Sequence, residues 1–96
     1  MRVAIVTGAG RGIGAAIAHR LAADGMSVGV VDLDEQGSRR TAKEITENGG
    51  RAIPIGADVA DETAAGNAVQ QTAAELGPVT VLVNSAGIIR DNLILE

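Results

Sequence analysis

Four short apolar runs alternate along the chain with longer stretches in which apolar positions recur at helical spacing. The runs occupy residues 3–7, 28–31, 51–56 and 79–83, and the helical stretches occupy 13–23, 35–48 and 61–76. The first run resembles strands that are buried on both faces of a parallel sheet. Strands alternating with helices in this way predict an α/β fold with a parallel sheet.

Each predicted helix has an apolar face. The faces are expected at Ile13, Ala16, Ile17 and Leu21, at Ala42 and Ile45, and at Ala65, Val69, Ala73 and Leu76. Most members of a set are spaced three or four residues apart, which places them on one side of a helix. Gly25 is positioned to end the first helix in a left-handed cap, and Asp61 is the expected N-cap of the third.

Pro54 lies inside the third predicted strand and limits where that strand can lie. Proline cannot donate to a sheet ladder, so it is found mostly on edge strands, at first positions and at bulges. In a doubly wound sheet of order 3-2-1-4, the third strand is an edge. We therefore predict that residues 1–96 form one Rossmann-type domain with helices on both faces of the sheet.

A glycine-rich turn, Thr7-Gly8-Ala9-Gly10-Arg11-Gly12-Ile13-Gly14, joins the first strand to the first helix. Glycine allows the backbone to turn tightly and to approach a ligand where a Cβ would collide. The following helix directs unpaired N–H groups and the positive end of its dipole at the turn. The pattern is T-G-x-x-x-G-x-G, whereas the common G-x-G-x-x-G would require glycine at Ile13. A glycine loop without a ligand is the alternative, but the flanking strand and helix favour a phosphate site.

Asp32 ends the second predicted strand, about 20 residues beyond the turn, where dinucleotide-binding folds place the acceptor for the adenosine ribose hydroxyls. Its charge repels a 2′-phosphate, so it favours NAD over NADP. Asp34 and Glu35 add negative charge nearby. Leu33 is grouped with Asp32 as a candidate cofactor-binding residue. The alternative interpretation of Asp32 is a turn residue or a helix cap.

Asn84-Ser85-Ala86-Gly87 follows the fourth predicted strand. Coming after the glycine turn and Asp32, this motif resembles the short-chain dehydrogenase/reductase family, which carries Asn-Asn-Ala-Gly at this point. The chain departs from that motif at Ser85, and serine retains a small hydrogen-bonding side chain. The run Ile-Ile-Arg-Asp-Asn-Leu at 88–93 is similar to the beta-ketoacyl-acyl carrier protein reductase branch.

The resemblance implies further contacts with a nicotinamide dinucleotide. It places Asp58 and Val59 against the adenine ring, although Asp58 taken alone could equally be a turn residue. It places the Asn-Ser-Ala-Gly motif beside the nicotinamide ribose. Arg11 is a basic residue of the kind that often accompanies a 2′-phosphate, so we expect NAD to be preferred and NADP to be the second candidate. The candidate cofactor-binding residues are Gly8, Gly10, Arg11, Gly12, Ile13, Gly14, Asp32, Leu33, Asp58, Val59, Asn84, Ala86 and Gly87.

The resemblance also implies an oxidoreductase that transfers hydride between nicotinamide and a carbonyl or alcohol substrate, with a beta-ketoacyl thioester as one candidate. In the family, a Tyr-x-x-x-Lys pair handles the proton. This sequence has no tyrosine, and its single lysine, Lys43, lies in the second predicted helix. No catalytic residue is therefore assigned. The 96 residues cover less than half of a family member, and we expect them to form an incomplete domain that is inactive alone.

Two other functions stay open. A non-catalytic module could bind a nucleotide or a partner, for instance by strand addition at the edge formed by residues 79–83. Another Rossmann-type protein, such as a methyltransferase, also combines glycines with an acidic residue, but the Asn-Ser-Ala-Gly motif disfavours it. The edge at residues 79–83 would lack a partner strand, and the helices that build the family's tetramer interface are absent. We therefore expect the isolated chain to be marginally stable or to shield that edge with another chain, and we expect a homo-oligomer.

Composition narrows the partners further. A net charge of −4 with scattered signs argues against nucleic acid, and the absence of cysteine excludes disulfides and thiolate chemistry. The apolar runs are too short for a membrane span or signal segment, so we expect a cytoplasmic protein, and no metal site is expected. His19 is interpreted as a surface residue. The second helix's basic cluster is expected to pair in solvent with Glu44 and Glu47, and it consists of Arg39, Arg40 and Lys43.

Overall fold

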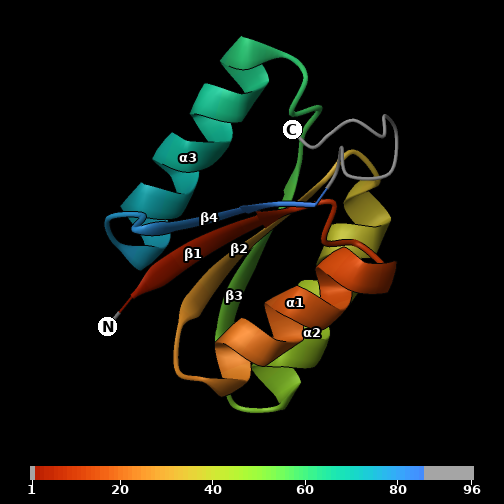
Figure 1. Ribbon diagram of the computed structural model, residues 1–96, viewed down its shortest axis with the longest axis vertical. Coiled ribbons are helices and arrows are strands. Elements are labelled where there is room, and N and C mark those ends of the chain that lie inside the picture. The colour runs from red at the N-terminus through yellow and green to blue at the C-terminus, as the bar shows by residue number, and fades with distance from the viewer. Residues whose placement is uncertain (1, 86–96) are drawn as a thin grey trace.

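The computed structural model describes residues 2–85 as one layered α/β unit, with a parallel sheet between two layers of helices (Figure 1). The elements in chain order are β1 (Val3–Thr7), α1 (Gly12–Ala23), β2 (Ser27–Asp32), α2 (Glu35–Glu47), β3 (Arg51–Gly56), α3 (Glu62–Leu76) and β4 (Val81–Asn84). The alternation of strand and helix agrees with the sequence pattern.

The four strands are all parallel and lie in the order β3-β2-β1-β4, which confirms the predicted order. Pro54 lies on the edge strand β3 opposite Val30 of β2. Helices α1 and α2 cover one face of the sheet and α3 covers the other (Figure 1). Because the strands are parallel, their carboxyl ends meet along one edge of the sheet, where the candidate site lies.

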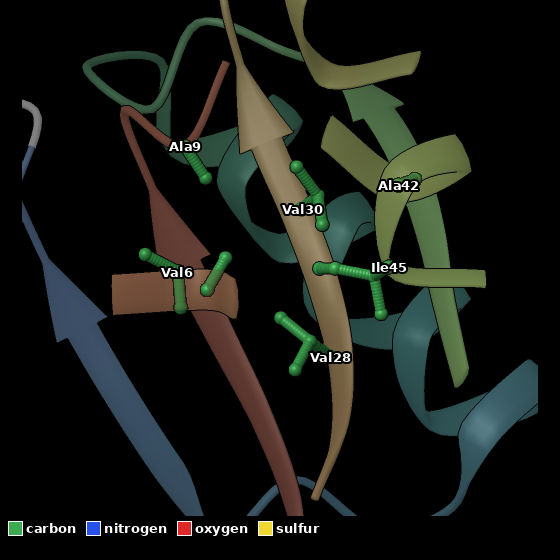
Figure 2. Close-up of a cluster of buried hydrophobic side chains, with 7 residues drawn as sticks. Val6, Ala9, Val28, Val30, Ala42 and Ile45 are labelled. Carbon is green, nitrogen blue, oxygen red and sulfur yellow. The ribbon is translucent and has the colours of Figure 1, made fainter. Parts of the chain in front are cut away.

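The main hydrophobic cluster fills the space between the sheet and the α1–α2 layer. Its members are Val6, Ala9, Ala18, Val28, Val30, Ala42 and Ile45, none more than 3% exposed. In Figure 2, Ile45 extends from α2 toward Val28 and Val30 on β2. Ala42 and Ile45 are thus the apolar contacts of α2, as predicted. Ala9 belongs to the glycine turn, so the turn itself is packed into the core.

The predicted apolar face of α1 is wrong at its N-terminal end. Ile13 is 70% exposed and Ala16 is exposed as well, whereas the buried residues of the helix are Gly14 and Ala18. Ile17 and Leu21 flank that narrow face and pack against the cluster. The small residues face inward because the glycine turn holds the start of the helix against the end of β1, where a larger side chain has no room.

The face of α3 is also displaced from its prediction. Ala68 and Thr72 are buried, while Val69 is 44% exposed. A Cβ built on Gly29 of β2 would lie 2.6 Å from Oγ1 of Thr72, so the helix rests on a glycine of the sheet. The Thr72 hydroxyl donates to the carbonyl of Ala68 at 2.8 Å, which satisfies it within the helix.

The fourth strand begins later than predicted. Residues 79–83 were expected, but β4 spans Val81–Asn84, and the Thr80 N–H already donates to the Val3 carbonyl at 3.0 Å. Within residues 2–85, β4 pairs only with β1, and Leu82 is 67% exposed. Across the same residues, no helix has the length and apolar character needed to span a membrane.

Candidate functional site

The site lies at the carboxyl edge of the sheet, where β1, β2 and β4 end. Thr7 pairs with Val31 on one side and with Asn84 on the other, so the parallel register brings three chain segments together. The glycine turn leaves this edge directly after Thr7 and enters α1. Two of the predicted features, the turn and Asp32, are therefore neighbours in space.

The turn adopts a conformation that requires glycine. Gly8 and Gly12 have φ angles of 66° and 61°, a region that side chains disfavour. A Cβ on Gly14 would lie 2.0 Å from the carbonyl oxygen of Gly8, which leaves no space for any side chain there. The start of α1 therefore touches the backbone of the turn, as a compact anion site needs.

Backbone hydrogen bonds hold the turn against β2. The Ala9 N–H donates to the Val31 carbonyl at 3.0 Å. The Gly10 N–H donates to Oδ2 of Asp32 at 2.8 Å, and the Asp34 N–H donates to the other oxygen, Oδ1, at 2.9 Å. Asp32 thus fixes the turn before α1 and the turn before α2 with one carboxylate. An ionised carboxylate has about four acceptor positions, so Asp32 keeps acceptor positions beyond these two bonds.

The turn also touches α2, which the sequence did not reveal. A Cβ on Gly37 would lie 3.0 Å from the Gly10 carbonyl oxygen, and Nη2 of Arg40 donates to that oxygen at 3.3 Å. The predicted pairing of the basic cluster with Glu44 and Glu47 is wrong for the two arginines. Gly37 in the first turn of α2 was the available signal. Glycine destabilises a helix, so its presence there indicates a close contact that excludes a larger side chain.

The other polar side chains of α2 form separate surface pairs. Arg39 binds Glu35 at 2.8 Å, four residues earlier in the same helix. Glu44 lies 3.0 Å from Nε2 of His19 on α1. His19 is therefore a partly exposed residue of the α1–α2 interface.

The N-terminus of α1 is open toward the turn. Within residues 2–85, it is the one helix start that has neither a side-chain cap nor an acidic residue in its first turn. By contrast, the Asp61 carboxylate caps α3, accepting from Thr63 N–H at 2.9 Å and Ala64 N–H at 3.4 Å, as predicted. The first N–H groups of a helix lack intrahelical partners, and they favour an anion.

The motif after β4 binds the end of β1. Oγ1 of Thr7 donates to Oδ1 of Asn84 at 2.9 Å, and the Ser85 hydroxyl donates to the Thr7 carbonyl. A Cβ on Gly14 would also lie 2.7 Å from Oγ of Ser85, so this motif lies beside the start of α1. Ala86 and Gly87, the other two candidates of the motif, lie outside the described residues.

Asp58 and Val59 follow β3 at the same edge. Oδ1 of Asp58 accepts from the Ala60 N–H at 2.9 Å, which is the geometry of the alternative, a turn residue. Val59 borders a hollow of about 200 Å³ between the sheet and α3, together with Val31 and Asn84. Arg11, Ile13 and Leu33 are exposed around the turn. Among residues 2–85, no group of His, Cys, Asp or Glu could hold a metal ion.

The sequence is similar to those of known proteins. A family model described as short chain dehydrogenase matches residues 2–96. The chain is 58% identical to the short-chain reductase protein NovJ of Streptomyces niveus, covering 97% of this chain and 36% of that protein. It is 45% identical to a 3-oxoacyl-[acyl-carrier-protein] reductase of Synechocystis, covering 99% of this chain and 39% of the relative.

A solved structure agrees with the fold. The crystal structure of a short chain dehydrogenase from Mycobacterium avium superposes with a TM-score of 0.86 at 41% identity, covering 94% of this chain and 36% of that one. The chain thus spans about a third of the length of the relatives that it matches.

Proposed function

Because the chain belongs to the short-chain dehydrogenase family, we propose that it forms the part of an oxidoreductase that binds a nicotinamide dinucleotide. The observation that carries the proposal is the glycine turn itself. Gly14 leaves no space for a Cβ against Gly8, and the uncapped start of α1 faces the turn. The residues present fit a pyrophosphate because backbone N–H groups and a helix N-terminus bind anions without a charged side chain.

Each part of the dinucleotide is assigned to a group of residues. The pyrophosphate is assigned to Gly8, Gly10, Arg11, Gly12, Ile13 and Gly14. The adenosine is assigned to Asp32, Leu33, Asp58 and Val59. The nicotinamide ribose is assigned to Asn84, Ala86 and Gly87. Within the adenosine group, the assignment of Asp58 has the least support, because its carboxylate already accepts from the Ala60 N–H.

Asp32 is proposed to favour NAD. It is held by two N–H donors at the end of β2, so its remaining acceptor positions have a fixed direction. A carboxylate accepts hydrogen bonds from ribose hydroxyls and repels a 2′-phosphate. Arg11 opposes this preference as an exposed cation in the turn, so NADP is the second candidate.

In the complete protein, the bound dinucleotide would supply hydride transfer to a carbonyl carbon or from an alcohol carbon. The role of this chain is to bind and orient it. The similar Synechocystis protein is a 3-oxoacyl-[acyl-carrier-protein] reductase, which supports a beta-ketoacyl thioester as the substrate class. The 96 residues contain no tyrosine to serve as the proton donor, so we expect no turnover from this chain alone.

A ligand titration tests the proposal. The chain has no Phe, Tyr or Trp, so the fluorescence of NADH can be followed without protein emission. We expect saturable binding of NADH, weaker binding of NADPH and displacement of both by ADP-ribose. Amide NMR signals of residues 8–14 should move with the same ligands. No binding of these ligands, or preferential binding of S-adenosylmethionine, would overturn the proposal.

A further inference from the structure

We propose that Arg40 is a positioning residue for the dinucleotide site, a role that rests on the proposed function. Arg40 holds the peptide between Gly10 and Arg11 so that its carbonyl oxygen faces α2 and its N–H faces the opposite way. The pyrophosphate then meets an N–H group instead of a carbonyl oxygen at this position.

The geometry begins with two hydrogen bonds on one glycine. The Gly10 N–H donates to Asp32 at 2.8 Å, and the Gly10 carbonyl accepts from Nη2 of Arg40 at 3.3 Å. Two consecutive peptide units of the turn are therefore held from outside the turn. In a planar trans peptide, the carbonyl and the N–H point in opposite directions. The bond to Arg40 consequently directs the Arg11 N–H away from α2.

Gly10 needs such a restraint because it has no side chain to limit its dihedral angles. A Cβ at this position would lie 2.8 Å from Oδ2 of Asp32 and 3.1 Å from the carbonyl carbon of Gly37, so the close docking on α2 excludes one. Because only glycine fits at this position, no Cβ is present to restrict rotation of the peptide. A rotated peptide would direct the negative end of a carbonyl dipole at the phosphate, which is repulsive.

The position of Arg40 on α2 follows from Gly37. Residues three apart lie on the same side of a helix, and Gly37 is the point where α2 touches the Gly10 carbonyl. Arg40, one turn later, reaches the same oxygen. The neighbouring Arg39 lies on a different side and binds Glu35 at 2.8 Å. Two adjacent arginines thus have equal charge, and only Arg40 binds the turn.

Arg39→Met is accordingly the matched control for Arg40→Met, because each substitution removes one positive charge from the same helix. The site is tested by NADH titration of the 96-residue chain. We expect Arg40→Met to weaken binding about tenfold, which corresponds to the lower end of the contribution of a hydrogen bond to a charged group. Arg39→Met should stay within about twofold of the wild type. Arg40→Lys, which retains one donor and the charge, should recover part of the loss.

Two further measurements separate positioning from stability. Amide NMR of the ligand-free chain should show shifts at Arg11 and Gly12 for Arg40→Met and none for Arg39→Met. The unfolding midpoints of the two variants should be similar. Equal affinities of the two Met variants would overturn the inference, and so would unchanged Arg11 and Gly12 signals in Arg40→Met. If Arg40→Met does not fold, Arg40→Gln and Arg39→Gln replace the two Met variants, and equal affinities of that pair overturn the inference. A wild-type chain that binds no dinucleotide overturns the proposed function, and the inference with it.

Discussion

Asp32 accepts the N–H of Gly10, 22 residues earlier in the chain, at 2.8 Å. The second oxygen of the same carboxylate accepts the N–H of Asp34 at 2.9 Å. The residue proposed to bind the ribose therefore also holds the turn proposed to bind the pyrophosphate. On this proposal, a substitution of Asp32 is expected to change both the cofactor preference and the shape of the turn.

Asp32→Asn should destabilise the chain. Both oxygens of Asp32 face N–H donors, and an asparagine can offer an oxygen to only one of them, leaving its amide donor against the other. We expect the free energy of unfolding to fall by about 1.5–3 kcal/mol, the usual effect of losing one hydrogen bond to a charged group. Urea unfolding followed by circular dichroism measures this change.

Asp34→Asn is the control, since it removes the same charge two residues away and its side chain does not cap α2. Its unfolding free energy should lie within about 0.5 kcal/mol of the wild type, as for most surface substitutions. Equal destabilisation by the two substitutions would show that the charge, and not the two hydrogen bonds of Asp32, is responsible.

Cofactor preference should move in the same variant. Asp32→Asn removes the negative charge that opposes a 2′-phosphate, so the ratio of the NADPH and NADH dissociation constants should fall about tenfold, equivalent to 1.4 kcal/mol. Both affinities should also weaken, because the turn loses part of its support. Parallel fluorescence titrations with the two cofactors measure the ratio. An unchanged ratio would contradict the assignment of Asp32 to the ribose.

Local and periodic features of the fold were predictable from the sequence. The apolar runs indicated the strands, and Pro54 agreed with the edge position that a doubly wound sheet gives the third strand. The Asp61 cap was found because capping depends on residues two and three positions away. The glycine turn was predictable because few residue types fit its conformation. Each of these features depends on a short stretch of chain, which a sequence displays directly.

Features that depend on close approach between elements were not predictable. The face of α1 was assigned from its large apolar residues, but the contact of Gly14 with Gly8 set the helix orientation and left Ile13 exposed. Likewise, Thr72 faces inward because Gly29 lies beneath it. Arg40 was assigned to solvent because Gly10 is 30 residues away, and only the docking of the turn on α2 brings them together.

Gly14→Ala should disrupt both the fold and binding. The new Cβ would lie 2.0 Å from the Gly8 carbonyl oxygen, so either α1 or the turn must move. We expect destabilisation by about 1–3 kcal/mol or more, as in other overpacked sites, and loss of detectable NADH binding. Urea unfolding and fluorescence titration of the same sample measure the two effects.

Gly66→Ala provides the matched control. Gly66 lies within α3 and is exposed. Apart from its chain neighbours and the backbone of its own helix, no atom of the described residues lies within 4 Å of a Cβ built on it. Alanine is a better helix former than glycine, so this substitution should stabilise the chain by about 0.5–1 kcal/mol and leave NADH binding unchanged. Similar effects of the two substitutions would contradict the proposed contact between Gly14 and the turn.

The edge of β4 should make the 96-residue chain self-associate. Within residues 2–85, this strand pairs only with β1, and Leu82 stands 67% exposed beside it. An apolar edge with unpaired backbone groups favours strand addition, and a charge placed on it opposes that pairing. In sedimentation velocity, the wild-type chain should associate as its concentration rises, and Leu82→Lys should shift it toward monomer. Ala74→Lys adds the same charge on the exposed side of α3 and should leave association unchanged. A wild-type chain that is monomeric at every concentration would show that this edge does not recruit a partner strand.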